Sequence, residues 1–192
     1  EDGIRDDISC LVGSEMCIRD SVHLVVVPER ERSLADCCAF VHKRYADRVN
    51  TRQGWTGHLW QARYRSFVMD EAHLLAAVRY VELNPVRARL CETPTQWPWS
   101  SVHAHLAGRS DDLVTVEPML QRVSDWHRYL TAGSSTRMED RLRRHTQNGR
   151  PAGDEAFIAR MERITGRVLA KRKPGPRPNH RKGDACPPNR IK

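Results

Sequence analysis

Apolar residues first gather at positions 22–27, where valine and leucine surround a single histidine, His23. A short apolar run of this length predicts a buried strand. Pro28 ends the strand, because proline has no N–H to donate to a strand ladder. His23 therefore lies near the start of a strand.

The next stretch predicts a helix that begins at Ser33. Serine is a good N-cap, and Asp36 three residues later is placed to complete a capping box. Turn-forming residues between Asn50 and Gly57 end the helix. Four of its residues recur at helical spacing and predict a stripe that packs on the core: Leu34, Cys37, Val41 and Tyr45.

Residues 59–69 bring aromatic side chains and arginines together and predict an extended, β-like stretch. Asp70 is a good N-cap for the following helix, which runs to about Leu83. Asn84 then caps a short helix that continues to Leu90. The residue before a proline avoids helical geometry, and Pro85 suits the first helical position.

The chain then passes through a compact aromatic loop at 97–101 and becomes helical. We expect helices over about 116–131, 137–147 and 154–169. The last helix has a clear apolar stripe, made of Phe157, Ile158, Met161, Ile164 and Val168. From 171 onward Pro, Gly, Lys and Arg dominate, which is typical of a tail that is disordered until it binds a partner.

Charge favours a polyanionic partner. The net charge is +8, with −4 in residues 1–21 and +7 in residues 171–192. Such a tail suits nucleic acid, although basic residues also serve solubility. No apolar run approaches the roughly 18 residues needed to cross a bilayer, and no secretory signal stands at the N-terminus. The six cysteines include no C-x-x-C pair, which favours reduced thiols and a cytoplasmic location.

One tyrosine on the helix after Asp70 is a candidate for chemistry. At 100° per residue, Leu74, Val78 and Val81 form the centre of the buried stripe, and Tyr80 lies on its flank. A tyrosine in that place can rest its ring on the core edge and hold its hydroxyl beside a polar group. Taken alone, a purely structural role is the more frequent one for such a residue.

Three motifs change that balance. They are Gly57-His58-Leu59-Trp60-Gln61-Ala62-Arg63-Tyr64, Arg79-Tyr80-Val81-Glu82-Leu83-Asn84-Pro85-Val86-Arg87-Ala88 and Trp97-Pro98-Trp99-Ser100-Ser101. In this order and spacing they closely resemble the REP-associated tyrosine transposases, relatives of the single-tyrosine HUH transposases of insertion sequences. The strand at 22–27 looks like the second half of that family's histidine–hydrophobe–histidine strand. The resemblance covers about residues 22–178.

The resemblance implies an α+β fold. We expect a partial ferredoxin-like HUH transposase core in residues 22–110, a helical C-terminal extension in 111–170 and a basic, disordered tail in 171–192. Residues 1–21 resemble translated adaptor sequence, or else a disordered leader, and we expect them to lie outside the fold. The N-terminal strands and helix of the core are then missing, and this copy is expected to be inactive as truncated.

The resemblance also implies a reaction. In the family, a tyrosine hydroxyl attacks single-stranded DNA at palindromic repeats that fold into hairpins, leaving a 5′-phosphotyrosine and a free 3′-hydroxyl. Mg²⁺ or Mn²⁺ polarises the phosphate, held by two strand histidines and a polar side chain one turn after the tyrosine. By position, Tyr80 is the nucleophile, and His23 and Asn84 are metal ligands. Ser21 stands where the second histidine is expected.

Further residues are candidates for contact with DNA: Trp60, Gln61, Arg63, Arg79, Arg87, Lys171, Arg172 and Lys173. Packing under the helix of Tyr80 is an equal alternative for Trp60, and a solvated helix face is the alternative for the arginines at 79 and 87. His73 is a weak replacement metal ligand. The rival function is a non-catalytic DNA-binding protein that uses the C-terminal helices and the basic tail.

Overall fold

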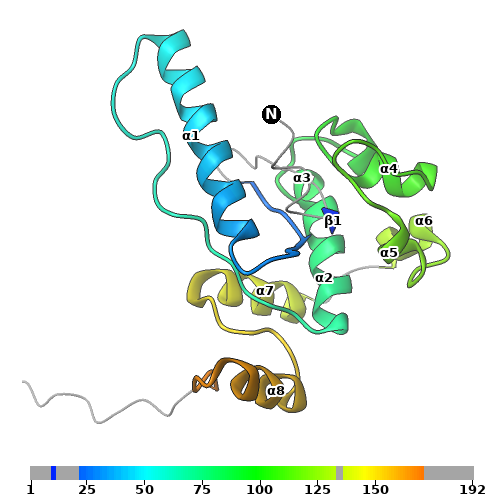
Figure 1. Cartoon of the computed structure of the whole chain (residues 1–192). Coiled ribbons are helices and arrows are strands. Elements are labelled where there is room, and N and C mark those ends of the chain that lie inside the picture. The colour runs from blue at the N-terminus through cyan, green and yellow to red at the C-terminus, as the bar shows by residue number, and fades with distance from the viewer. Residues whose placement is uncertain (1–9, 12–21, 133–135, 171–192) are drawn as a thin grey trace, which may run out of the picture.

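The computed structural model describes residues 10–11, 22–132 and 136–170, and Figure 1 shows their arrangement. The elements are β1 (Cys10–Leu11), β2 (Val26–Val27), α1 (Ser33–Gln53), α2 (Glu71–Glu82), α3 (Asn84–Arg87), the 3-10 helix η2 (Pro94–Gln96), α4 (Val102–Ala107), α5 (Glu117–Leu120), α6 (Trp126–Thr131), α7 (Thr136–Asn148) and α8 (Glu155–Thr165). Most of the described chain is thus helical. Within these ranges, no helix combines the length and the apolar character that crossing a membrane requires.

Helix α2 lies at the centre of the molecule and forms as its sequence predicts. The Asp70 side chain accepts a hydrogen bond from the His73 backbone N–H at 2.9 Å, so the predicted N-cap is confirmed. Val78 and Val81 are buried. Leu74 is partly buried against the same core, so the predicted apolar stripe is confirmed as well.

The core lies between α2 and the helices that follow it in the chain. Figure 1 shows α4, α5 and α6 grouped on one side of α2. The largest cluster of buried side chains draws on each of these helices and on the segment before β2: Val25, Val78, Val102, Met119, Trp126, Tyr129 and Leu130. This packing buries one side of α2 and leaves another side for other contacts.

The predicted strand at 22–27 is shorter in the structure. Only Val26 and Val27 form β2, paired antiparallel with β1 so that Cys10 lies opposite Val27. A strand needs a neighbour for its backbone N–H and C=O groups, and pairing is seen over these two positions. Cys10 and Leu11 belong to the stretch that we expected to lie outside the fold, and in the structure they pair with β2.

Helix α1 differs from its prediction at its beginning and along its face. Ser33 is the first helical residue rather than the cap, and its hydroxyl accepts from the Arg30 backbone N–H at 3.1 Å. The last residue of the helix is Gln53. Gly54 follows it in the left-handed conformation that ends many helices. Val41 and Tyr45 are 50% and 53% exposed. The expected core stripe of α1 is thus half uncovered.

Residues 59–69 were predicted to be β-like and form no strand. The segment runs extended, and its single ladder contact is a parallel bridge between Met69 and Ala152. The Ala152 N–H donates to the Val68 carbonyl at 2.8 Å, and the Asp70 N–H donates to the Ala152 carbonyl at 2.9 Å. These bonds tie the start of α2 to the chain that leads into α8.

The C-terminal half matches its prediction in part. Helix α7 is confirmed, but the single helix expected over 116–131 is two, since Asp125 caps α6 by accepting from the Arg128 N–H at 2.8 Å. Helix α8 ends at Thr165, where Gly166 adopts a left-handed conformation. Val168, expected in its apolar stripe, lies beyond that end and is 64% exposed. Positions 21 and 171–173 lie outside the described residues.

Candidate tyrosine site

Tyr80 projects from the last turn of α2 into a half-buried place between three other parts of the chain. The His23 ring meets its ring edge-on, with 6.3 Å between centroids and 78° between planes. On a ring face, the Arg87 guanidinium carbon lies 3.9 Å from the Tyr80 centroid, which is a close cation–π contact. The structure thus brings together Tyr80 and His23, which lie 57 positions apart in the sequence.

Arg87 is held in this place by several contacts. Helix α3 follows α2 directly and turns Arg87 back, so that Nη2 donates to the Tyr80 carbonyl at 2.6 Å. Nη1 lies 2.6 Å from a carboxylate oxygen of Glu139 on α7, and both side chains are largely buried. The sequence made Arg87 a candidate for contact with DNA, with a solvated helix face as the alternative. In the structure its charge is already paired with Glu139, which makes it first of all a support for the tyrosine ring.

A second arginine reaches the hydroxyl of Tyr80. Nε of Arg143, on α7, donates to this hydroxyl oxygen at 3.3 Å. The hydrogen bond with Tyr80 raises the pKa of Arg143 above its ordinary value, and the charge of Asp140 adds to the effect. The Asp140 carboxylate lies 3.6 Å from Arg143 Nη1, and both side chains are more than half exposed. An exposed pair of this kind is weak and can exchange its carboxylate for another anion.

His23 is a neutral imidazole at the edge of the site. Burial lowers its pKa below 6.5, and the positive charge of Arg87 lowers it further. At pH 7 it therefore carries a lone pair on one ring nitrogen, as a proton acceptor or a metal ligand requires.

The two metal ligands implied by the sequence resemblance, His23 and Asn84, both lie near the positive charge of Arg87. Asn84 is buried, and its amide oxygen faces Arg87 Nη2 at 3.5 Å. Its Nδ2 has no hydrogen-bond partner among the described residues. Within that part of the chain, no three His, Cys, Asp or Glu side chains are placed to share an ion. A divalent cation beside Asn84 would also meet the guanidinium charge. In this arrangement the residues do not fit the ion, and the requirement for Mg²⁺ or Mn²⁺ stays a prediction.

The other predicted contacts lie elsewhere. The Arg79 guanidinium carbon lies 4.2 Å from the Tyr129 ring centroid, on the core side of α2. Trp60 packs against α1 rather than under α2, stacked on His42 at 4.2 Å. Gln61 and Arg63 are exposed on the extended segment after α1. The structure therefore does not gather these four residues around Tyr80.

His73, the weak replacement ligand, is a structural residue. Its ring is buried, and Nδ1 lies 2.7 Å from the Asp70 carboxylate that caps α2. The pKa of Asp70 lies below its usual value. Burial alone would raise it, but hydrogen bonds from His73 and Asp154 outweigh the burial. The pair therefore holds the beginning of α2 in place.

Sequence reasoning missed the contribution of α7 to the site. Figure 1 shows α7 beside α2, and the two helices pack together. Arg143 is 63 residues from Tyr80, and neither it nor Glu139 belongs to a motif around the tyrosine. The only signal in the sequence was that four arginines occur in 13 residues.

Comparison of the chain with family models, with curated proteins and with solved structures found no match.

Proposed function

We propose that the protein is a single-tyrosine DNA strand transferase of the HUH transposase type, with a partial ferredoxin-like core and Tyr80 as its nucleophile. The observation that carries the proposal is the surroundings of Tyr80. Its ring is fixed by Arg87, its hydroxyl contacts the exposed cation Arg143, and the neutral imidazole of His23 is next to it. A buried structural tyrosine needs a single hydrogen-bond partner, whereas a nucleophile needs an anion site and a base.

In the proposed reaction the Tyr80 oxygen attacks a DNA phosphate. A bond forms between this oxygen and phosphorus, and the bond from phosphorus to the 3′-oxygen of the preceding nucleotide breaks. His23 accepts the phenol proton, and water supplies a proton to the leaving 3′-oxygen. Arg143 releases Asp140 and stabilises the negative charge that develops on the phosphate oxygens. The 5′-phosphotyrosine can then be attacked by another 3′-hydroxyl, which transfers the strand.

The experiment that tests this proposal is covalent capture. We would incubate the protein with a pool of single-stranded hairpin oligonucleotides labelled at the 3′ end, with Mg²⁺, with Mn²⁺ or with a chelator. The sequence predicts an inactive copy, but Tyr80, Arg87, Arg143 and His23 are together in this chain. We therefore expect label that comigrates with the wild-type protein on a denaturing gel and no such label for Tyr80→Phe. Tyr64→Phe is the matched control, since Tyr64 is exposed on the extended segment after α1.

Two outcomes contradict the proposal. Label on Tyr80→Phe would place the nucleophile elsewhere, and folded wild type that binds the pool without forming an adduct would exclude strand transfer. An adduct that forms in the presence of the chelator would show that the arginines stabilise the reacting phosphate without a metal. It would contradict the predicted requirement for Mg²⁺ or Mn²⁺.

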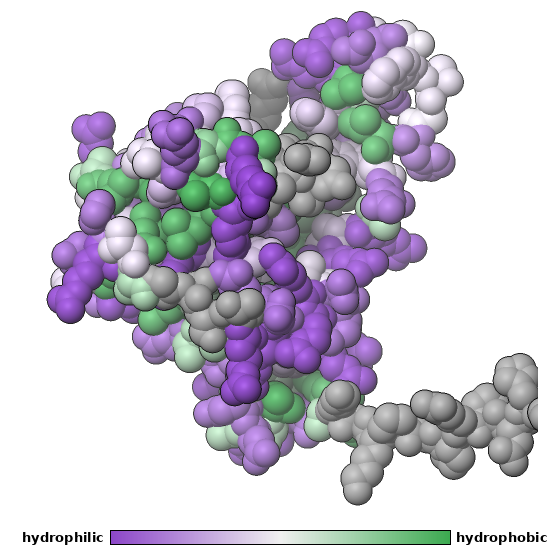
Figure 2. All heavy atoms as spheres, turned by 180° about the vertical axis from the view of Figure 1, so that it is seen from behind, coloured by the Kyte–Doolittle hydropathy of each residue, from purple (hydrophilic) through white to green (hydrophobic). Residues whose placement is uncertain are grey.

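A non-catalytic DNA-binding protein is the second candidate, because α7 exposes arginines beyond the one at Tyr80. Arg137, Arg141 and Arg144 are exposed on this helix. Figure 2 shows a strongly hydrophilic surface between the main body and the lobe of α8. Helix α7 packs on α2, and the Asp154 N–H before α8 bonds to Asp70 at 3.0 Å, so the two helices are anchored to the core rather than forming a separate pair. Binding without an adduct would favour this reading.

A further inference from the structure

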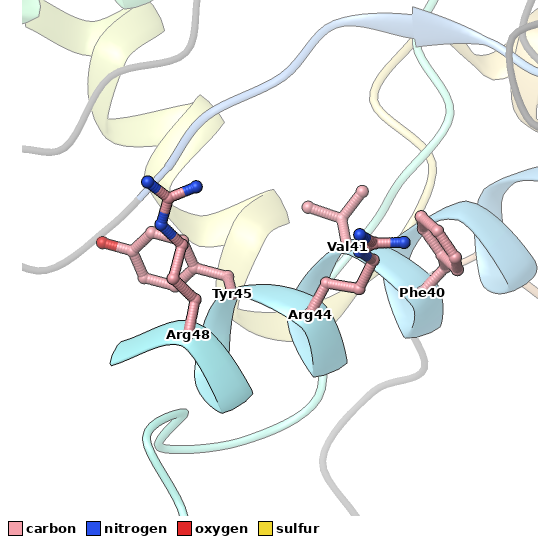
Figure 3. Close-up of a pocket in the computed structure, with 5 residues that line it drawn as sticks. All are labelled: Phe40, Val41, Arg44, Tyr45 and Arg48. Carbon is pink, nitrogen blue, oxygen red and sulfur yellow. The ribbon is translucent and has the colours of Figure 1, made fainter. Parts of the chain in front are cut away.

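One face of α1 remains uncovered and combines aromatic with cationic side chains. Figure 3 shows its shallow hollow, which is lined by Phe40, Val41, Arg44, Tyr45 and Arg48. Phe40 and Tyr45 are 43% and 53% exposed. Phe40, Arg44 and Arg48 follow one another at intervals of four, so they form a row about 12 Å long on the helix.

In the part of the chain that the structure describes, the arginines of this face take no part in the ion pairs of α1. Arg44 lies over the Phe40 ring, 5.3 Å from its centroid. The helix acids are matched by other cations, since Asp47 pairs with Lys43 at 3.2 Å and Asp36 with Arg32 at 3.2 Å. Within the described ranges, Arg44 and Arg48 make no ion pair. The hollow is therefore positively charged and has no acid opposite its two guanidinium groups.

Trp60 gives the aromatic surface a rigid border. Its ring stacks on His42 with 25° between planes, and its indole N–H donates to the His42 carbonyl at 2.9 Å. Tyr45 lies against Trp60, with 5.6 Å between ring centroids. The extended segment after α1 is thus fastened to the helix beside the hollow, and Tyr45 is held at the boundary.

We propose that this α1 face binds single-stranded DNA, with unpaired bases on Phe40 and Tyr45 and phosphates on Arg44 and Arg48. Single strands bind to surfaces where aromatic rings lie beside arginines. Every base has a π-face that can stack on a ring, and every phosphodiester link carries a negative charge that an arginine can neutralise. An apolar protein partner would bury two guanidinium groups without counterions, which is costly. Duplex DNA keeps its bases stacked inside the helix, so it offers none of them to the two aromatic rings. The identity of the polymer as DNA rests on the proposed function.

The test measures the binding of a fluorescent oligothymidine of about 16 nucleotides, the upper end of common single-strand site sizes. We expect Phe40→Ala/Tyr45→Ala to weaken binding about tenfold or more. For Arg44→Ala/Arg48→Ala, the slope of log K against log salt should fall by about 1.4, or about 0.7 for each lost phosphate contact. Trp99→Ala and Arg109→Ala, exposed residues away from α1, are matched controls.

Several outcomes overturn the inference. Wild-type affinity and salt slope in both double variants would remove α1 from the binding surface. Stronger binding of duplex DNA or of the matching RNA than of the oligothymidine would show that single-stranded DNA is not the preferred ligand. Loss of self-association in Phe40→Ala/Tyr45→Ala, with unchanged DNA binding, would assign the face to a second copy. Covalent capture and oligothymidine binding are two separate measurements on the wild-type protein. A missing covalent adduct therefore contradicts the proposed function alone, and unchanged α1 variants contradict this inference alone.

Discussion

Tyr80 and Glu82 lie two residues apart on α2, and their side chains meet very different surroundings. Glu82 has no exposure to solvent and is a hydrogen-bond centre of the core. One carboxylate oxygen accepts from the Ser101 hydroxyl at 2.6 Å and lies 2.7 Å from His105 Nδ1, and the other accepts from the Trp126 indole N–H at 2.9 Å. These three partners come from α4, α6 and the loop before α4.

The Tyr80 side is built with fewer and looser contacts. Among the described residues, the Tyr80 hydroxyl has one weak, exposed partner in Arg143, whereas the Glu82 carboxylate is saturated by buried donors. A buried carboxylate stabilises a fold only when its partners fully satisfy it, so Glu82 joins α2 to its neighbours. The comparison teaches that one helix can use a fully satisfied polar group for cohesion and leave an incompletely satisfied one able to take a further partner.

The largest expected effect comes from breaking the Glu82 side. Glu82→Ala leaves the Trp126 indole and the Ser101 hydroxyl buried without an acceptor, and we expect a loss of about 3–5 kcal/mol in the free energy of unfolding. Tyr80→Phe, the control, should change it by no more than about 0.5 kcal/mol. Urea titration followed by circular dichroism measures both. Equal losses in the two variants would erase the contrast between the two sides.

The next effect concerns a tyrosine on the core side. Burial raises the pKa of Tyr129 to about 12, although the charge of Arg79 opposes the rise, and its hydroxyl donates to the Leu75 carbonyl. Ultraviolet titration of the phenols should show one group that ionises about two units late, and Tyr129→Phe should remove it. The unfolded phenol ionises first, so stability falls as pH rises above 10. A late group that survives in Tyr129→Phe would contradict this assignment.

A smaller effect is expected at Asp70, which begins the helix shared by both sides. Asp70→Ala removes the N-cap of α2 and the bond from the Asp154 N–H, for a loss of about 1–2 kcal/mol. Since the pKa of Asp70 is lowered, its contribution is present above pH 3.8 and is lost as pH falls through the lower value of the folded state. Urea titrations at neutral and acid pH measure this. Asp36→Ala, an exposed acid on α1, is the control, and an equal loss there would contradict the assignment.

The smallest effect is a pH dependence on the Tyr80 side. The pKa of His23 lies below 6.5 in the folded protein, so below pH 6.5 the unfolded chain binds more protons and stability falls. His23→Gln should flatten this part of the curve of unfolding free energy against pH, while His103→Gln, an exposed control, should not. A curve that His23→Gln leaves unchanged would mean that His23 is not the buried neutral group of this site.

Local signals explain which elements could be predicted. The beginning of α2 follows from Asp70, which needs only the N–H three residues away, and its buried stripe follows from helical spacing. The strand predicted at 22–27 is longer than the two-residue β2 that forms, and the β-like stretch predicted at 59–69 forms no strand. Strand pairing depends on a distant partner that a local pattern cannot supply. The stripe on α1 was expected to be buried for the same reason, since periodicity does not show what covers a face.

The candidate site divides in the same way. The motif around Tyr80 singles out this tyrosine and predicts its place on the flank of α2. Arg143 and Glu139 were missed because the packing of α7 on α2 brings them to the tyrosine from about 60 positions away. Glu82 carried a local sign that was overlooked, because it lies four residues after Val78 on the buried side of the helix.

By itself, the sequence determined where α2 begins, which of its residues face the core, and that a tyrosine lies at the edge of that face. Helical hydrogen bonds and caps join residues within four positions, so these features depend on short stretches of chain. Only the tertiary structure decided what surrounds Tyr80 and Glu82. It set an exposed arginine of α7 at the hydroxyl and three buried donors at the carboxylate, through contacts that exist only once distant helices have packed.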